Sequence, residues 1–348
     1  MCIERITFCP KIGECAPVQG IIIRMSQFDL FFSDVAWGKD SIAERVIGTY
    51  LYPHVLFSDI FLDNRDSAIE IVETTTIESH EILLTRNGGL FVRPPSSMSD
   101  PYRDLEGHLI DDLQAKLAFE EKAAVCFNRV ICELALLGIV SQPATPVHIS
   151  YGRLINNHAL ISNGGGGREM YLERTTNPLG MLFRNDWHTL RMYPDVLAKK
   201  AMEQECAKFL VEVSEDLPAL VAGAYSLFSQ RQLSEALIDS WIVCEQVIDH
   251  LWKNYISTIE DKSRVKRLDD NRTYSVAVRT EILHSIGEIS APIYNELNKA
   301  RKNRNELAHG AKTTLSETTV CLNAMKLIVE FLCNRTVEPP LANVGVTW

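Results

Sequence analysis

The stretch 303–312, NRNELAHGAK, places an arginine, an asparagine and a histidine close together near the C-terminal end of the chain. A histidine titrates near neutral pH, so it can accept or donate a proton during a reaction. An arginine is always charged and offers forked hydrogen-bond donors to phosphate oxygens. One such pair is a poor site alone, but two pairs related by a twofold axis would surround one phosphate with a base, an acid and two cations.

The spacing of Arg304 and His309 decides whether the two side chains can act together. Five residues on a continuous helix correspond to a rotation of about 140°, so they would not share a face. Gly310 follows directly and is typical of the position after a helix end, which predicts that the helix stops at His309 and lets it return beside Arg304. The simpler alternative is a helix end where a cation favours the dipole. The same spacing recurs at Arg153 with His158, interpreted as accidental, and at Arg279 with His284, interpreted as structural.

Several residues upstream complete a family pattern. The stretch 233–256 is an amphipathic helix that carries Glu245 among apolar neighbours. Together with residues 225–228, Ala236, Trp241, Leu251, Trp252 and the RNELAHG stretch, it resembles the HEPN superfamily, particularly the Apea-like HEPN domains of bacterial phage-defence proteins. The resemblance covers residues 215–335. It implies a short helical bundle that dimerises, so that the R-N-x-x-x-H motifs of two protomers meet in one cleft and cut RNA without a metal.

The resemblance also assigns roles. It implies that His309 handles protons while the ribose 2′-OH attacks the adjacent phosphate, that Arg304 stabilises charge on that phosphate, and that Asn305 orients the reacting groups. Glu245 matches an acidic position that steadies the motif arginine. No metal and no cofactor are expected. The alternative is a HEPN-like module that only dimerises or binds a partner.

Charge is distributed unevenly along the chain. The formal net charge is −10, which argues against a domain that coats nucleic acid by electrostatics alone. Local basic clusters could still attract an RNA backbone, although such clusters are also typical of solvated helix ends and surface loops. The expected RNA-binding residues are Lys299, Arg301, Lys302 and Lys312 beside the motif, and Arg264, Lys266 and Arg267 in the segment 261–275.

The elements that must position these residues indicate an α+β protein. Residues 1–200 are predicted to form a mostly antiparallel, β-rich domain with one long helical region. Strands are expected in segments 20–34, 50–63 and 67–85, before a turn at 87–89, because these segments are rich in β-branched and aromatic residues. The segment 105–137 repeats apolar residues at helical spacing and ends before Gly138. The glycine run 164–167 lacks the residues of a phosphate-binding loop and is interpreted as a plain loop.

Residues 201–335 are predicted to form an all-helical bundle, and residues 336–348 an unpacked tail. Thr314 and Glu317 have the spacing of a capping box at the start of the last helix. Nine cysteines without a C-x-x-C pair suggest reduced thiols, hence a cytoplasmic protein. No secretory signal and no membrane span are expected.

These patterns lead to one functional expectation. The chain is expected to be a homodimeric antiviral (phage) defence effector, an abortive-infection toxin in which the HEPN-like bundle is a metal-independent endoribonuclease. RNA is the expected substrate, with tRNA as one candidate. The N-terminal domain would recognise a signal, such as a phage-derived activator, and restrain the enzyme until then.

Overall fold

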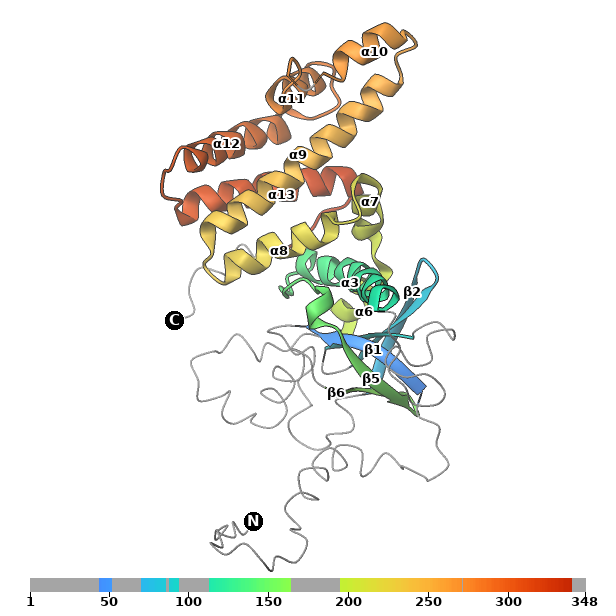
Figure 1. The fold of residues 1–348 in the computed structure, drawn as a ribbon. Coiled ribbons are helices and arrows are strands. Elements are labelled where there is room, and N and C mark those ends of the chain that lie inside the picture. The colour runs from blue at the N-terminus through green and yellow to red at the C-terminus, as the bar shows by residue number, and fades with distance from the viewer. Residues whose placement is uncertain are drawn as a thin grey trace, which may run out of the picture. The chain divides into compact units, whose positions relative to one another are not determined.

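The computed structural model describes residues 44–51, 70–85, 88–93, 113–163, 195–270 and 272–339 (Figure 1). All of them belong to one compact unit, residues 43–348. The predicted strand at 20–34, nearly all of the one at 50–63 and the glycine run 164–167 lie outside the described residues. None of the helices in the described ranges is long and apolar enough to cross a membrane.

The described strands form one antiparallel sheet of six strands in the order β2-β3-β4-β1-β5-β6. The predicted antiparallel, β-rich character of this part of the chain is therefore confirmed. The bounds are β1 Glu44–Tyr50, β2 Ile71–Ile77, β3 His80–Thr85, β4 Gly89–Val92, β5 Ser150–Ile155 and β6 His158–Asn163.

The central strand, β1, is one that the sequence did not predict. Its stretch begins with two charged residues and contains Gly48, and glycine and glutamate are depleted in strands. The sheet explains the glycine: a Cβ at position 48 would lie 2.5 Å from the carbonyl oxygen of Leu90 and 2.4 Å from the ring of Phe91 on the neighbouring β4. Close backbone approach therefore selects glycine here, against strand propensity.

Helix α3 (Leu113–Leu136) covers the sheet and separates it from the bundle (Figure 1). Within the described residues it is a single helix, and it ends before Gly138 as the sequence predicts. Gly138 has φ +95°, and the N–H of Ile139 bonds to the carbonyl of Leu134 at 2.7 Å, which closes the last turn of the helix. A 3₁₀ turn (Pro146–His148) then leads to β5.

The C-terminal region is helical, as predicted, and α9 lies at its centre. Helix α9 packs against α8, α11, α12 and α13 (Figure 1), and its predicted apolar stripe is buried at Leu237, Trp241, Cys244 and Ile248. The helices are α6 (Asp195–Glu203), α7 (Glu205–Val213), α8 (Leu217–Ser229), α9 (Leu233–Ser257), α10 (Lys262–Leu268), α11 (Val276–Ser285), α12 (Ala291–Ala308) and α13 (Leu315–Cys333).

One apolar core runs from the sheet through α3 into the helices, from Ile47 to Val337. The predicted domain boundary near residue 200 stays a prediction. The start of the C-terminal tail is packed, in contrast to the sequence prediction. Val337 is buried, its N–H bonds to Glu330, and the N–H of Glu338 bonds to the carbonyl of Leu136 at the end of α3. The sequence signal failed because these contacts use backbone groups, which composition does not reveal.

Candidate active site at the end of helix α12

Helix α12 ends as the sequence predicts. His309 is its C-terminal cap, and Gly310 follows with φ +88°. The N–H of Gly310 bonds to the carbonyl of Leu307 at 2.9 Å, and the N–H of Ala311 to that of Glu306 at 3.0 Å. These two hydrogen bonds form the Schellman motif, which requires a residue that tolerates positive φ directly after the cap. The imidazole of His309 therefore stands at an exposed helix end.

Arg304 and Asn305 lie one turn before this end. The Nη1 of Arg304 donates a hydrogen bond to Oδ1 of Asn305 at 3.3 Å, and both side chains are half-buried. Arg304 follows the buried Leu297 by seven residues, so it starts from the core-facing side of the helix. The neutral amide of Asn305 orients the guanidinium without cancelling its charge.

Within one chain, the motif residues are neighbours but do not all touch. Among the described contacts, no hydrogen bond or ion pair joins the side chain of Arg304 to His309 or to Glu245. Glu245 is half-buried on α9, one of the helices against which α12 packs. The expected return of His309 beside Arg304 is thus not made as a direct contact in the single chain.

The connection after His309 is fixed at both ends. The side-chain amide of Asn303 donates to the carbonyl of Glu317 at 3.2 Å, which ties α12 to the first turn of α13. The predicted capping box is confirmed: Thr314 Oγ1 accepts from the N–H of Glu317, and the Glu317 carboxylate accepts from the N–H of Thr314 at 2.7 Å. Thr313 also lies 3.3 Å from Ser234 at the start of α9.

The cations of α12 fall into two groups. Lys299 pairs with Glu296 at 2.6 Å, and Lys302 lies 3.8 Å from Glu306, so a carboxylate neutralises each lysine. Arg301 and Arg304 have no carboxylate within 4 Å among the described residues, and both contact asparagine amides instead. The Nη2 of Arg301 lies 3.5 Å from Oδ1 of Asn298, and its Nε is buried without a hydrogen-bond partner there.

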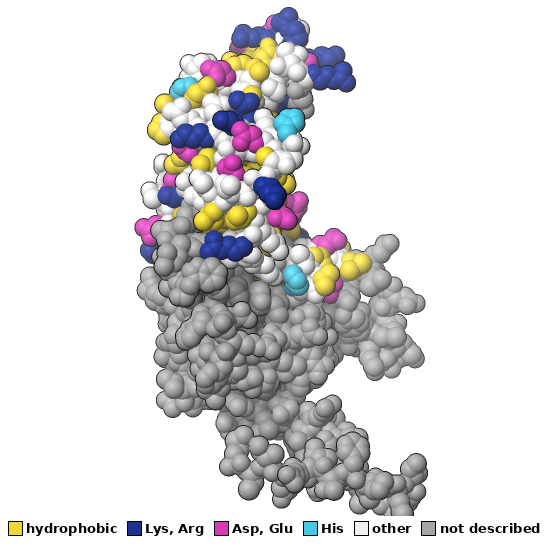
Figure 2. All heavy atoms as spheres, turned by 90° about the vertical axis from the view of Figure 1, so that its left-hand side faces the viewer, with side chains coloured by type: hydrophobic (Ala, Val, Ile, Leu, Met, Phe, Trp, Pro, Cys, Tyr) yellow, Lys and Arg dark blue, Asp and Glu magenta, His cyan; other side chains and the backbone are white. Residues whose placement is uncertain are grey.

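The second predicted basic cluster lies elsewhere. Arg264, Lys266 and Arg267 are exposed on the short α10, whose start is capped by Asp261. Figure 1 shows α10 at the tip of the bundle, with α11 between it and α12. In Figure 2, basic side chains gather at that tip, whereas elsewhere on the coloured face they alternate with acidic ones. The expected RNA-binding residues therefore occupy two surfaces, and Lys312 is exposed in the loop after His309.

The side chains of Arg279 and His284, a pair at the same spacing, make contacts within the helical core. Arg279 is buried and pairs with Asp249, while its guanidinium lies 5.8 Å from the ring centre of Trp252. The imidazole of His284 stacks on Tyr294 with ring centres 4.4 Å apart, and its Nδ1 is 3.0 Å from the carbonyl of Ile289. Both contacts support the structural interpretation of this pair.

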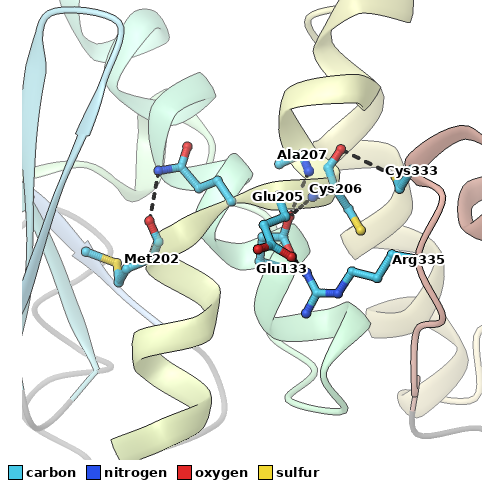
Figure 3. Close-up of polar contacts among 8 residues, drawn as sticks. Glu133, Met202, Glu205, Cys206, Ala207, Cys333 and Arg335 are labelled. Carbon is cyan, nitrogen blue, oxygen red and sulfur yellow. Dashed lines mark hydrogen bonds and ion pairs between the residues drawn. The ribbon is translucent and has the colours of Figure 1, made fainter.

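The sequence missed a buried polar cluster that joins α3 to the helices behind it (Figure 3). Glu133 is fully buried in α3, and its Oε1 accepts the N–H groups of Cys206 and Ala207 at 2.5 and 2.8 Å, which caps the start of α7. The Nη1 of Arg335 lies 3.6 Å from Oε2 of Glu133 and 3.0 Å from Glu205. Burial raises the pKa of the Glu133 carboxyl above its ordinary value of 4.5, against the opposing effect of the two N–H donors.

Two thiols complete this cluster. The Sγ of Cys333 lies 3.6 Å from the carbonyl oxygen of Cys206, and the hydrogen bond between the two thiols lowers the pKa of Cys206. The cluster therefore links α3, the start of α7 and the end of α13. A single glutamate at an apolar helix position was the available signal in the sequence, but a lone residue does not identify its partners.

No group of three or more histidine, cysteine, aspartate or glutamate side chains is placed to hold a metal ion in the described ranges. Comparison of the chain with models of known protein families, with curated proteins and with solved structures finds no match.

Proposed function

We propose that the helical region is a HEPN-like, metal-independent endoribonuclease that works as a homodimer. The observation that carries this proposal is the composition of the α12 end. An exposed histidine closes the helix, and two half-buried arginines nearby lack carboxylate partners among the described residues. Because guanidinium groups bind phosphate oxygens in forked geometry, this arrangement suits a phosphodiester.

The chemistry follows from these groups. The neutral imidazole of His309 accepts the proton of a ribose 2′-OH, whose oxygen then attacks the neighbouring phosphorus. Arg304 stabilises the negative charge on the phosphate oxygens while the bond to the 5′-oxygen breaks. The leaving 5′-oxygen takes a proton from a second histidine, so the products are a 2′,3′-cyclic phosphate and a 5′-hydroxyl.

A dimer supplies that second histidine. Among the described contacts, no hydrogen bond joins Arg304 to His309, and His309 is exposed, so it is free to approach a partner. In a twofold dimer, His309 of the partner subunit would face the Arg304 of this chain, and the reverse contact would form at the same time. Glu245 is proposed to steady Arg304 once the dimer has formed.

The biological setting belongs to the same proposal. The resemblance supports an antiviral effector that cuts RNA, with tRNA as one candidate, in the cytoplasm of an infected cell. The N-terminal region would restrain the enzyme until a phage-derived activator is present, because free ribonuclease activity would harm the host.

The test is cleavage of total tRNA by the purified full-length protein in EDTA, with mapping of product ends. Arg304→Ala and His309→Ala are each expected to reduce cleavage by a factor of about 100 or more, since both act on the reacting phosphate. Lys253→Ala is the control, because Lys253 lies on α9, is exposed and is paired with Asp249.

Several measurements bear on the outcome. Circular dichroism shows whether each variant stays folded, and light scattering shows whether it stays dimeric. Cyclic-phosphate ends that vanish in both site variants support the proposal. If full-length protein, with and without lysate of phage-infected cells, makes no cuts but still dimerises and binds a partner unaffected by His309→Ala, the non-catalytic binding module is the better description.

A further inference from the structure

Arg301 carries a charge that the described part of the structure does not neutralise. It is half-buried, and among the described residues its one hydrogen-bond partner is the neutral side chain of Asn298. Its Nε is buried without a partner there. Burying an arginine without a counter-charge costs free energy. An anionic ligand that binds to the guanidinium would offset this cost.

The lysines next to Arg301 differ from it, because each of them has a carboxylate partner. Lys299 and Lys302 flank Arg301 in the sequence, are exposed, and have carboxylates at 2.6 and 3.8 Å. Helix α12 has two glutamates for four cations, and both glutamates lie beside lysines, so Arg301 and Arg304 are left with amides. A general surface charge would not explain this division between arginines and lysines.

The position of Arg301 relative to Arg304 suggests its ligand. Residues three apart on a helix are neighbours on its surface, so the two guanidinium groups lie on adjoining turns. Each is steadied by an asparagine, Asn298 for Arg301 and Asn305 for Arg304. The two arginines, three residues apart, lie along one side of the helix, which suits a ligand with two neighbouring anionic groups.

We propose that Arg301 binds the phosphate next to the one that is cut, so that Arg301 and Arg304 hold two consecutive phosphates of one RNA strand. This inference rests on the proposed function. It narrows the substrate class: efficient cleavage requires a strand with at least two phosphates, and Asn298 is a positioning residue for Arg301. Since the contact is to a phosphate, it contributes binding without base specificity.

The experiment compares short substrates that differ by one phosphate. The full-length protein is given a dinucleotide with one phosphodiester, the same dinucleotide with an additional 3′- or 5′-terminal phosphate, and a trinucleotide. For the wild type, an added phosphate on one side is expected to lower KM. Arg301→Ala is expected to remove that gain, raising KM for the longer substrates by about tenfold, while leaving kcat and the plain dinucleotide unchanged.

Three variants make the result specific. Arg301→Lys keeps the charge and is expected to recover part of the lost affinity, because lysine lacks the forked donors. Asn298→Ala is expected to act in the same direction as Arg301→Ala but less strongly. Lys253→Ala removes an exposed lysine of α9 that is paired with Asp249, and it is expected to change KM less than twofold.

The outcomes separate this inference from the proposed function. If the wild type cuts RNA and Arg301→Ala affects all substrates equally, or none, the two-phosphate contact is wrong while the nuclease proposal stands. If Arg301→Ala abolishes kcat even on the dinucleotide, Arg301 acts on the reacting phosphate and the assignment to a neighbouring phosphate is overturned. If the wild type cuts none of the substrates and no tRNA, both proposals fail together.

Discussion

The side-chain amide of Asn303 reaches the backbone carbonyl of Glu317 across the connection between α12 and α13, at 3.2 Å. This contact fixes the end of one helix on the first turn of the next. Since His309 lies inside that connection, the contact also restricts where its imidazole can stand. In the proposed nuclease, the position of a proton-transfer group strongly affects the rate, so this contact is expected to influence RNA cleavage as well as stability.

Replacing Asn303 with alanine tests this link. The change is expected to lower the free energy of unfolding by about 1 kcal/mol, the usual loss for a hydrogen bond. It is also expected to slow RNA cleavage several-fold by loosening His309. Asn254→Ala is the control, because its amide contacts His250 on an exposed helix face. Equal effects of both changes on cleavage would contradict a positioning role.

Gly310→Ala is expected to destabilise the protein by about 1 kcal/mol, because φ is +88° and an L-residue strains there. Gly287 is a matched control: it has φ +82°, ends α11 with the same bond pattern, and likewise has open space around an added Cβ. Gly287→Ala should cost similar stability in urea unfolding but leave cleavage unchanged. Cleavage that falls equally in both variants would show that only stability matters.

Glu133 is expected to make stability depend on pH. Its folded-state pKa is raised by burial, so the folded chain binds a proton more readily than the unfolded chain. This contribution is fully present below the unfolded pKa, near 4.5, and is lost as pH rises through the folded pKa. Urea unfolding from pH 5 to 8 should therefore show the wild type losing free energy of unfolding relative to Glu133→Gln as the pH rises. If the free energies of unfolding of the wild type and Glu133→Gln differ by the same amount at every pH in that range, the proposed pH dependence of Glu133 is wrong.

Asp249 forms ion pairs with two cations, one buried and one exposed, so it allows the effect of burial on the strength of an ion pair to be measured. Arg279 contacts it from a buried position, whereas Lys253 contacts it at 2.9 Å with its side chain 65% exposed. Arg279→Ala is expected to cost about 3 kcal/mol, because a partly buried carboxylate loses its buried partner. Lys253→Ala is expected to cost less than about 0.5 kcal/mol. Thermal or urea unfolding of the two variants measures both, and similar losses would contradict the assignment.

The fold could be predicted where side chains carry the pattern. The apolar stripe of α9, the end of α3 before Gly138 and the capping box of Thr314 all follow from spacing and residue type. The central strand β1 could not be predicted, because its glycine is selected by contact with β4. The packed start of the tail was also missed, since its bonds use backbone groups that are common to every sequence.

For the candidate site, the sequence located the helix end and the residues at it, but not their partners. Arg301 and Lys302 are indistinguishable as basic residues in the sequence, and only the described contacts show that one is paired with a glutamate and the other is not. The sequence does not show that α10 lies away from the end of α12, because this depends on how the helices pack. It also does not show that Glu133 caps the start of α7, because this contact joins two distant segments.

The contact between Glu338 and Leu136 joins residues that are distant in sequence. The same is true of the contact of Cys333 with Cys206 at the start of α7, and of Arg335 with Glu133 in α3. During synthesis, α3 leaves the ribosome long before residues 333–338 exist. The C-terminal end of α3 and the carboxylate of Glu133 are therefore not fully covered until residues 333–338 have been made. For a proposed toxin, maturation that depends on the synthesis of residues 333–338 would keep shorter nascent chains from becoming active.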